Sequence, residues 1–405
     1  MTAASGITGT GDFAVIDGRS AGFYALVAGL AAVVAAGLWG AHVMDVEGHH
    51  VTGMNNQIVW GLPHVFAIFL IVAASGALNV ASLSSVMGKA IYAPYARLSG
   101  VLAIALLLGG LVVITLDLGR PERLVVALTH FNAKSVFAWN VLFYTGFVVL
   151  TVLYLWAIME RRMRAMTRPV GAVLFVWRLA LTTATGLIFG VLVAREAYDA
   201  ALMAPMFIAM SLAFGTAVNL AVLLAAARWA RMPLDDAVVQ GLARMLAWFV
   251  AAVLYLVVVF HAVKLYAVGL QGVERFVLAD GGAITALFWL GQIGAGAVLP
   301  LALLLGPRTA RSRSAIAAAA GLVLIGGLAQ VYVIVIGGQA YPLDIFPGME
   351  VIESGFYDGV ISRYRPSLPE IGLALGGVAL ALLVVVLSMK VLELAPRAAG
   401  RSRGG

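Results

Sequence analysis

Long runs of apolar residues, separated by short polar connections, constrain this chain more than any other feature of its sequence. A helix needs about 20 mostly apolar residues to cross the hydrocarbon core of a bilayer. We expect ten such helices, at residues 20–44, 58–85, 95–117, 133–159, 170–195, 202–227, 242–268, 281–305, 313–338 and 369–393. The sequence therefore predicts an all-α fold, a polytopic membrane helical bundle made of two four-helix bundles and two further helices.

The composition supports lipid as the main solvent. Charged residues make up 11% of the 405 residues and hydrophobic residues 62%, whereas soluble proteins carry roughly a quarter charged residues. Residues 1–19 contain Asp12, Asp17 and Arg19 before any apolar run begins. This is not the pattern of a cleaved signal peptide, so we expect the first helix to remain in the mature protein.

Basic residues predict the orientation of the chain. An even number of spans places both termini on one side, and most of the 26 lysines and arginines fall there, among them Arg161, Arg162, Arg164 and Arg168. Cytoplasmic loops of membrane proteins are enriched in basic residues, so we expect both termini to be cytoplasmic, in a bacterial inner membrane. Short basic clusters between apolar runs do not make a phosphate-binding face, so no nucleic-acid partner is expected.

These boundaries divide the chain into five parts. We expect a cytoplasmic tail at 1–19, a first four-helix bundle at 20–159, a second at 160–305, a final helix pair at 306–393 with a periplasmic loop at 339–368, and a basic cytoplasmic tail at 394–405. Within the fourth of these parts, Ser367 and Glu370 have the spacing of a capping box that begins the final helix.

Two pairs of segments suggest an internal repeat. SGALNVASL in the second predicted helix resembles FGTAVNLAVL in the sixth, which aligns Asn79 with Asn219 after a shift of one residue. VVITLDLGR can be laid over VVVFHAVKL with a shift of one residue, which aligns Asp117 with His261. Matches four helices apart indicate a parallel repeat. Segments rich in alanine and leucine also match by chance, so both explanations stay open.

Ionisable residues gather at the predicted outer ends of the helices, and charges inside a bilayer are candidate functional residues because they are costly. Asp117 ends the third helix and would accept a proton from a ligand hydroxyl, with Arg120 keeping it ionised. Pairing with Arg120 for topology alone is the alternative. His64 opens the second helix and suits proton exchange, because an unperturbed imidazole has a pKa of about 6.5; an interfacial hydrogen bond is its alternative.

Further polar residues at this end are candidates for the same site, although belt positions, turns, caps, surface pairs and snorkelling are ordinary explanations for them. They are Trp60, His130, Asn132, Ser135, Glu196 and His261. Arg178 lies about eight residues into the fifth helix, roughly 12 Å along it, followed by Thr182 and Thr185. These three residues predict a proton path toward the outer site, unless Arg178 snorkels to the nearer surface.

The run TLDLGRPERL, followed by THFNAKSVFAWN, lies at the end of the third helix and the start of the fourth, and GLPHVFAIFLIVAASG opens the second. In this order and topology the segments resemble the NrfD/PsrC family, the membrane subunits of polysulfide reductase and related sulfur-metabolism complexes. The resemblance covers most of the chain. It is greatest to the ten-helix branch, which includes DsrP and membrane subunits of some hydrogenases and of alternative complex III.

The resemblance implies a quinol-interacting subunit of an oxidoreductase complex that does not itself act on the terminal substrate. Such subunits exchange electrons and protons between quinone or quinol (menaquinone or ubiquinone) and a ferredoxin-like 4Fe–4S subunit docked on the periplasmic face, beside further catalytic or cytochrome subunits. The family's quinone site maps onto His64 and Asp117, with Arg120, His130, Asn132 and Ser135 at adjacent motif positions. Docking is expected to involve Arg363 and Arg365.

The absence of cysteine agrees with this assignment, because a protein without thiolates cannot hold an iron–sulfur cluster in the usual way. A di-haem subunit would need paired histidines at two depths, and no inner pair exists, so we expect no haem and no metal site. A secondary transporter or a proton-conducting channel subunit is the remaining alternative. Transporters of that kind have broken helices meeting at the membrane midplane, whereas the polar residues here lie toward one face.

Overall fold

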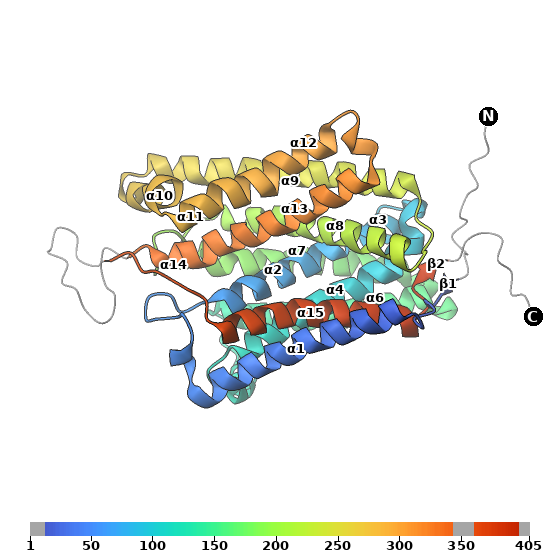
Figure 1. Ribbon diagram of the computed structural model, residues 1–405, viewed down its shortest axis with the longest axis horizontal. Coiled ribbons are helices and arrows are strands. Elements are labelled where there is room, and N and C mark those ends of the chain that lie inside the picture. The colour runs from blue at the N-terminus through green and yellow to red at the C-terminus, as the bar shows by residue number, and fades with distance from the viewer. Residues whose placement is uncertain (1–12, 343–359, 397–405) are drawn as a thin grey trace, which may run out of the picture.

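The computed structural model describes residues 13–342 and 360–396, and long helices run through the molecule with their connections at its two ends (Figure 1). Within these described ranges, ten helices are long and apolar enough to cross a membrane. They span Ala21–Glu47, Leu62–Ser85, Ala90–Leu116, Val136–Met159, Arg161–Gly190, Met203–Trp229, Asp236–Tyr266, Ala283–Leu305, Arg313–Ala340 and Leu368–Val391. The predicted fold class and all ten predicted spans are confirmed.

Several spans are made of more than one helical segment. In sequence order the principal elements are α1 (Ala21–Glu47), α2 (Leu62–Ala77) and α3 (Asn79–Ser85), α4 (Ala96–Leu116), α6 (Val136–Met159), α7 (Thr167–Gly190), α8 (Met203–Trp229), α9 (Asp236–Tyr266), α11 (Ala283–Ala286), the π-helix η7 (Leu287–Val298) and α12 (Leu299–Leu305), α13 (Arg313–Tyr332), the π-helix η9 (Val333–Gly337) and α14 (Gly338–Ala340), and α15 (Leu368–Val391).

Short elements connect these spans. They are η1 (His49–Val51), η2 (Ala90–Tyr95), η3 (Pro121–Arg123), α5 (Leu124–Thr129), η4 (Arg161–Met166), η5 (Val268–Leu270), α10 (Gln271–Arg275), the π-helix η6 (Phe276–Asp280) and η8 (Thr309–Arg311). Strand β1 (Phe13–Ala14) pairs antiparallel with β2 (Ala395–Pro396).

The strand pair joins the first and last described segments at one end of the bundle, which we call the terminal end (Figure 1). The opposite end carries η1, α10, α14 and the start of α15, and we call it the outer end. Both β1 and β2 therefore lie on one side, as an even number of spans requires. Which side faces the cytoplasm stays a prediction based on the basic residues.

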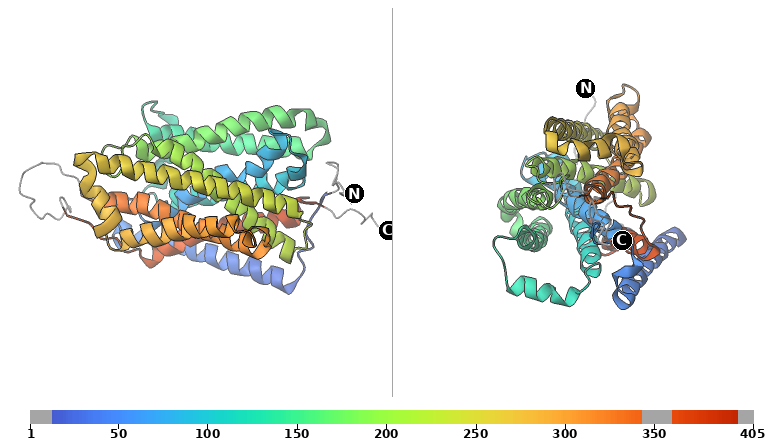
Figure 2. Two further views of the ribbon diagram at one scale, coloured as in Figure 1. Left: turned by 90° about the horizontal axis from the view of Figure 1, so that it is seen from above. Right: turned by 90° about the vertical axis from the view of Figure 1, so that its left-hand side faces the viewer.

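The spans form two groups of four, with α1 and α15 together at one edge (Figure 2). In the first bundle α2 packs on α4, α4 on α6 and α6 on α7; in the second bundle α8 packs on α9 and α13, and α13 on η7. The prediction had placed the first span inside the first bundle. It packs against α15 instead because glycines allow the two backbones to meet: a Cβ on Gly37 would lie 2.9 Å from Gly376 Cα.

The two bundles meet where α2 crosses α8. The crossing is formed by Gly76 and Gly215, and a Cβ added to Gly76 would lie 1.7 Å from the Ser211 carbonyl oxygen. Asn79 Nδ2 donates to Thr216 Oγ1 at 2.8 Å, and the Asn219 amide donates back to the first bundle. The two asparagines that the possible repeat aligns thus bond in opposite directions across one interface, an arrangement that favours the repeat.

Candidate functional site

The outer end of the first bundle brings a carboxylate and an imidazole together. Asp117 follows the last residue of α4, and His64 lies in the first turn of α2, where Pro63 is tolerated because those amides have no intrahelical partner. His64 Nδ1 lies 2.7 Å from Asp117 Oδ2, and their side chains are 17% and 0% exposed. The two residues that the sequence singled out first are therefore neighbours.

A second imidazole contacts the same residue. His49 Nε2 lies 3.0 Å from the Asp117 carbonyl oxygen and 4.0 Å from its Oδ1. Sequence reasoning gave His49 no role, because a histidine in a loop carries no periodic signal. Its proximity to another outer-end histidine and acid was the available clue.

The expected partner of this carboxylate is different in the structure. Arg120 is exposed where the turn after α4 enters η3, and among the described residues no carboxylate forms an ion pair with it. The direct pairing of Arg120 with Asp117 is therefore not formed, and an effect of Arg120 on the charge of Asp117 stays a prediction. Two histidines, His49 and His64, lie within 4.0 Å of the carboxylate instead.

A group of aromatic rings lies on one side of the His64 imidazole. The Trp60 ring stacks on it with centroids 6.2 Å apart and planes at 24°. Trp60 also makes edge contacts with Phe189 at 5.9 Å and with Phe137 at 6.3 Å. Phe137 is 52% exposed on α6, so this aromatic group reaches from the buried carboxylate to the side of the bundle.

The loop before α2 is held in place by the ninth span. Gln339 Oε1 accepts the Val59 and Trp60 amides at 2.9 and 3.0 Å, and Gln339 Nε2 donates to the Trp60 carbonyl. Gln57 Nε2 donates to the Ala340 carbonyl at 2.9 Å. These contacts fix the backbone that presents Trp60 and His64, and they join distant positions, since Gln339 and Trp60 are separated by 279 residues.

The last span holds the same loop from the other side. Glu370 is 0% exposed, and its Oε2 accepts the Gly53 and Ser367 amides, both at 2.8 Å, within the predicted capping box. Tyr364 Oη donates to Glu370 Oε1 and accepts the Leu62 amide, both at 2.6 Å. Burial and the bond to Glu370 raise the pKa of Tyr364, so its hydroxyl stays protonated.

The Asp117 cluster is left with unsatisfied polar atoms. Both carboxylate oxygens and His64 Nδ1 are buried without an aligned hydrogen bond among the described residues, because the close His64 contact is off the direction that a hydrogen bond requires. A buried polar group without a partner costs about 1–3 kcal/mol. A ligand hydroxyl group placed here would satisfy these atoms.

Three other predicted site residues are engaged in local turns. His130 Nδ1 contacts Thr129 Oγ1 at 3.0 Å, Asn132 Oδ1 accepts the Lys134 amide at 3.0 Å, and Ser135 Oγ accepts an amide as the N-cap of α6. The turn and cap chemistry that the sequence left open is therefore present. A role of these residues in ligand binding stays a prediction.

His261 and Glu196 have partners in or beside the second bundle. His261 Nδ1 contacts Glu274 Oε2 at 2.6 Å and its ring packs on Phe288. The Glu196 carbonyl accepts a bond from Lys264 Nζ at 2.8 Å. Glu274 was missed by sequence reasoning, because it lies on the short helix α10 outside every predicted span.

The predicted proton path is buried inside the first bundle. Arg178 is 2% exposed, and its Nη1 donates to the Ser75 carbonyl at 2.8 Å and to Asn79 Oδ1 at 2.7 Å. It thus binds the break between α2 and α3 and does not snorkel. Thr182 and Thr185 hydroxyls donate to carbonyls of their own helix at 3.1 and 3.0 Å. Proton conduction through these residues stays a prediction.

The segment before α15 alternates in exposure. Ser362 is buried, Tyr364 is half-buried, and Arg363 and Arg365 are exposed at the outer end. The two arginines are therefore accessible there, while docking stays a prediction. The predicted loop at 339–368 is described only at residues 339–342 and 360–368, and its remainder lies outside the described residues.

Comparison with known proteins adds to this geometry. The family model described as polysulphide reductase, NrfD, matches residues 50–342. The protein is 29% identical over 389 residues to the Hdr-like menaquinol oxidoreductase integral membrane subunit of Archaeoglobus fulgidus, covering 96% of this sequence and 98% of that protein. It is 26% identical to a putative dimethyl sulfoxide reductase membrane subunit of Halobacterium salinarum, covering 94% and 93%.

A shorter match supports the same group of proteins. A polysulfide reductase polypeptide of Wolinella succinogenes is 23% identical over 267 residues, covering 61% of this sequence and 83% of that protein. All three relatives are named as parts of oxidoreductases. The residues matched by the family model include His64, Asp117 and the second bundle.

Proposed function

Because the chain belongs to the polysulphide reductase NrfD family, we propose that it exchanges electrons and protons between a quinol and an iron–sulfur subunit of a membrane redox complex. One observation carries this proposal: the buried Asp117 carboxylate lies 2.7 Å from His64, and its oxygens lack an aligned hydrogen-bond partner among the described residues. A buried acceptor beside a base is what removal of a hydroxyl proton requires.

The residues of the cluster have distinct parts in this proposal. A bound quinol supplies two electrons and two protons. Asp117 accepts a hydroxyl proton, and His64 takes up a proton beside it, so that negative charge does not accumulate in the buried site. His49, with a side chain 32% exposed and bonded to the Asp117 carbonyl, passes protons to the outer end. Trp60 stacks on His64 and orients a flat ring, while Phe137 marks the approach from lipid.

The electron acceptor is proposed to be a ferredoxin-like subunit carrying 4Fe–4S clusters. The relatives are named as subunits of oxidoreductases, which supports a partner in general. Arg363 and Arg365 are exposed at the end of the bundle that carries the cluster, and positive charge there suits an acidic partner surface. We place this outer end in the periplasm of a bacterial inner membrane. Menaquinol is the preferred quinol because the Archaeoglobus relative is named a menaquinol oxidoreductase.

Replacement of the carboxylate tests the proposal. Asp117→Asn keeps the shape of the side chain and removes its proton-accepting charge, so quinol-dependent reduction of the partner is expected to fall at least about 100-fold. The matched control is Asp45→Asn, an exposed acid near the outer end of α1. Stopped-flow measurement of cluster reduction in the purified complex reports the rate. Unchanged turnover in Asp117→Asn, with normal assembly, would overturn the assignment.

A further inference from the structure

The second bundle contains a buried contact between an imidazole and a carboxyl group. His261 on α9 and Glu274 on α10 approach to 2.6 Å between Nδ1 and Oε2, and their side chains are 14% and 2% exposed. Unlike the His64 contact, this one has the geometry of a hydrogen bond. A carboxylate shielded from water to this degree is costly unless it is paired.

Charged groups surround this pair on the neighbouring elements. Lys264 follows His261 by about one turn of α9 and is 3% exposed; its Nζ donates to the carbonyls of Glu196, Ala197 and Tyr198 at 2.8, 2.6 and 3.1 Å. The α7–α8 connection adds the acids Glu196 and Asp199. On α10 itself, Arg275 is engaged with Asp280 at 2.5 Å. The ammonium group of Lys264 thus provides a positive charge one turn from the pair.

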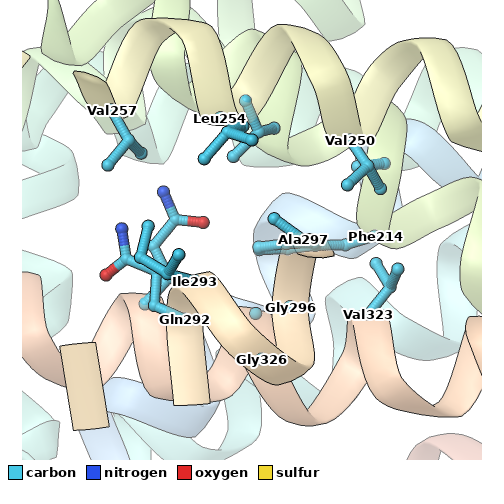
Figure 3. Close-up of a pocket in the computed structure, with 14 residues that line it drawn as sticks. Phe214, Val250, Leu254, Val257, Gln292, Ile293, Gly296, Ala297, Val323 and Gly326 are labelled. Atoms are coloured by element: carbon cyan, nitrogen blue, oxygen red, sulfur yellow. The ribbon is translucent and has the colours of Figure 1, made fainter. Parts of the chain in front are cut away.

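The pair borders an internal cavity that continues toward the middle of the bundle. A cavity of about 40 Å³ is lined mostly by apolar residues, and His261, Glu274, Gln292 and Gln330 add polar groups to its wall. A second cavity of about 20 Å³ shares the two glutamines and extends to Gly296. Figure 3 shows this second space between α9 and η7. A cavity needs about 10–15 Å³ of such volume to hold one water molecule, so both have room for water and neither has room for an organic ring.

The cavities also offer polar partners for water. Gln292 Oε1 and Gln330 Nε2 are buried without a hydrogen-bond partner among the described residues. Gln292 is 7% exposed and Gln330 3%, and each lies in or beside a π-helix, η7 and η9. π-helical segments occur frequently at functional sites. Water bridging these amides to Glu274 would satisfy atoms that are otherwise unpaired.

We propose that the His261–Glu274 pair is a proton-binding site at the outer end of an internal file of water molecules, which Gln292 and Gln330 hold inside the second bundle. The proton balance is simple. With a neutral imidazole and an ionised carboxylate the pair carries one negative charge. A proton passed along the water file binds the Glu274 carboxylate as an O–H group and neutralises the pair. The opposite transfer returns the proton to the file. Lys264 offsets the charge of the deprotonated state.

This proposal is independent of quinol exchange, and its test uses the full-length protein in liposomes without quinol or partner. Infrared difference spectra between acidic and neutral pH report two signals: the C=O band of a carboxyl group shielded from bulk water, and water bands that shift in H2¹⁸O. Glu274→Gln is expected to remove the shielded carboxyl band. The exposed acid Asp280 provides the control, since Asp280→Asn should leave that band in place.

A second variant tests the water separately. The double substitution Gln292→Leu and Gln330→Leu keeps side-chain size and removes the polar partners, so at least half of the ¹⁸O-sensitive intensity should disappear while the carboxyl band remains. A band unaffected by Glu274→Gln would overturn the proton site, and a parent spectrum without ¹⁸O-sensitive bands would overturn the water file. If Glu274→Gln does not fold, the double Gln292→Leu and Gln330→Leu variant still decides, because the proposal requires it to lose at least half of the ¹⁸O-sensitive intensity.

Discussion

The two bundles each place an imidazole beside a buried carboxylate near the outer end, but the hydrogen bonding and the surroundings of the two pairs differ. His64 and Asp117 lie 2.7 Å apart without an aligned hydrogen bond and beside stacked aromatic rings. His261 and Glu274 form a hydrogen bond of 2.6 Å that faces cavities of water size. Unsatisfied polar atoms favour binding of a ligand, whereas a hydrogen-bonded pair beside a cavity of water size suits the proposed storage of a proton. The surroundings, rather than the pair itself, set the chemistry.

The largest expected effect separates the two histidines. His64→Phe keeps the aromatic packing with Trp60 and removes a base, so quinol turnover in the complex should fall about 100-fold, within the range that general acid–base groups contribute. His261→Phe should change turnover less than threefold. Steady-state quinol oxidation by both variants measures this difference. Equal losses would mean that both pairs serve the quinol reaction and would remove the distinction between the bundles.

A smaller effect is expected from the contacts that support only the first pair. Glu370→Gln places an amide donor among three hydrogen-bond donors, the Gly53 and Ser367 amides and the Tyr364 hydroxyl. Loss of one bond to a charged group costs about 1.5–3 kcal/mol. We expect a lower Tm and an increase of about tenfold in the KM for quinol. The control is the exposed Glu122→Gln; the carboxyl band of Glu274 should be unchanged in both.

The smallest effect concerns alkaline pH. The pKa of Tyr364 is raised in the folded protein above the ordinary tyrosine value of about 10. Above about pH 10, Tyr364 loses its proton in the unfolded protein but keeps it in the folded protein. The free energy of unfolding therefore falls as pH rises. Tyr364→Phe should make this decline shallower by about one proton. Unfolding followed between about pH 9 and 11 measures the slope, and the exposed Tyr266→Phe should leave it unaltered.

Much of this architecture was predictable from the sequence, because the bilayer requires apolar runs of a certain length. The convergence of His64 and Asp117 was predictable from their positions at neighbouring helix ends. The position of α1 beside α15 was not, since helix association in lipid depends on which small residues face each other. Contacts of loop residues, such as His49 with Asp117 or Gln339 with Trp60, join distant parts of the sequence without any periodic signal.

The break between α2 and α3 has a consequence for how the protein is made. Its freed Ser75 carbonyl is satisfied by Arg178, which lies 103 residues later in the sequence. At the usual rate of synthesis, about 5–20 residues per second, roughly 5–20 seconds pass before that arginine is available. Until then the Ser75 carbonyl has only the long contact of 3.4 Å from the Leu78 amide within its own span. The break in the second span therefore gains its charged partner only after the fifth span has been synthesised, and the first bundle cannot complete its packing before that point.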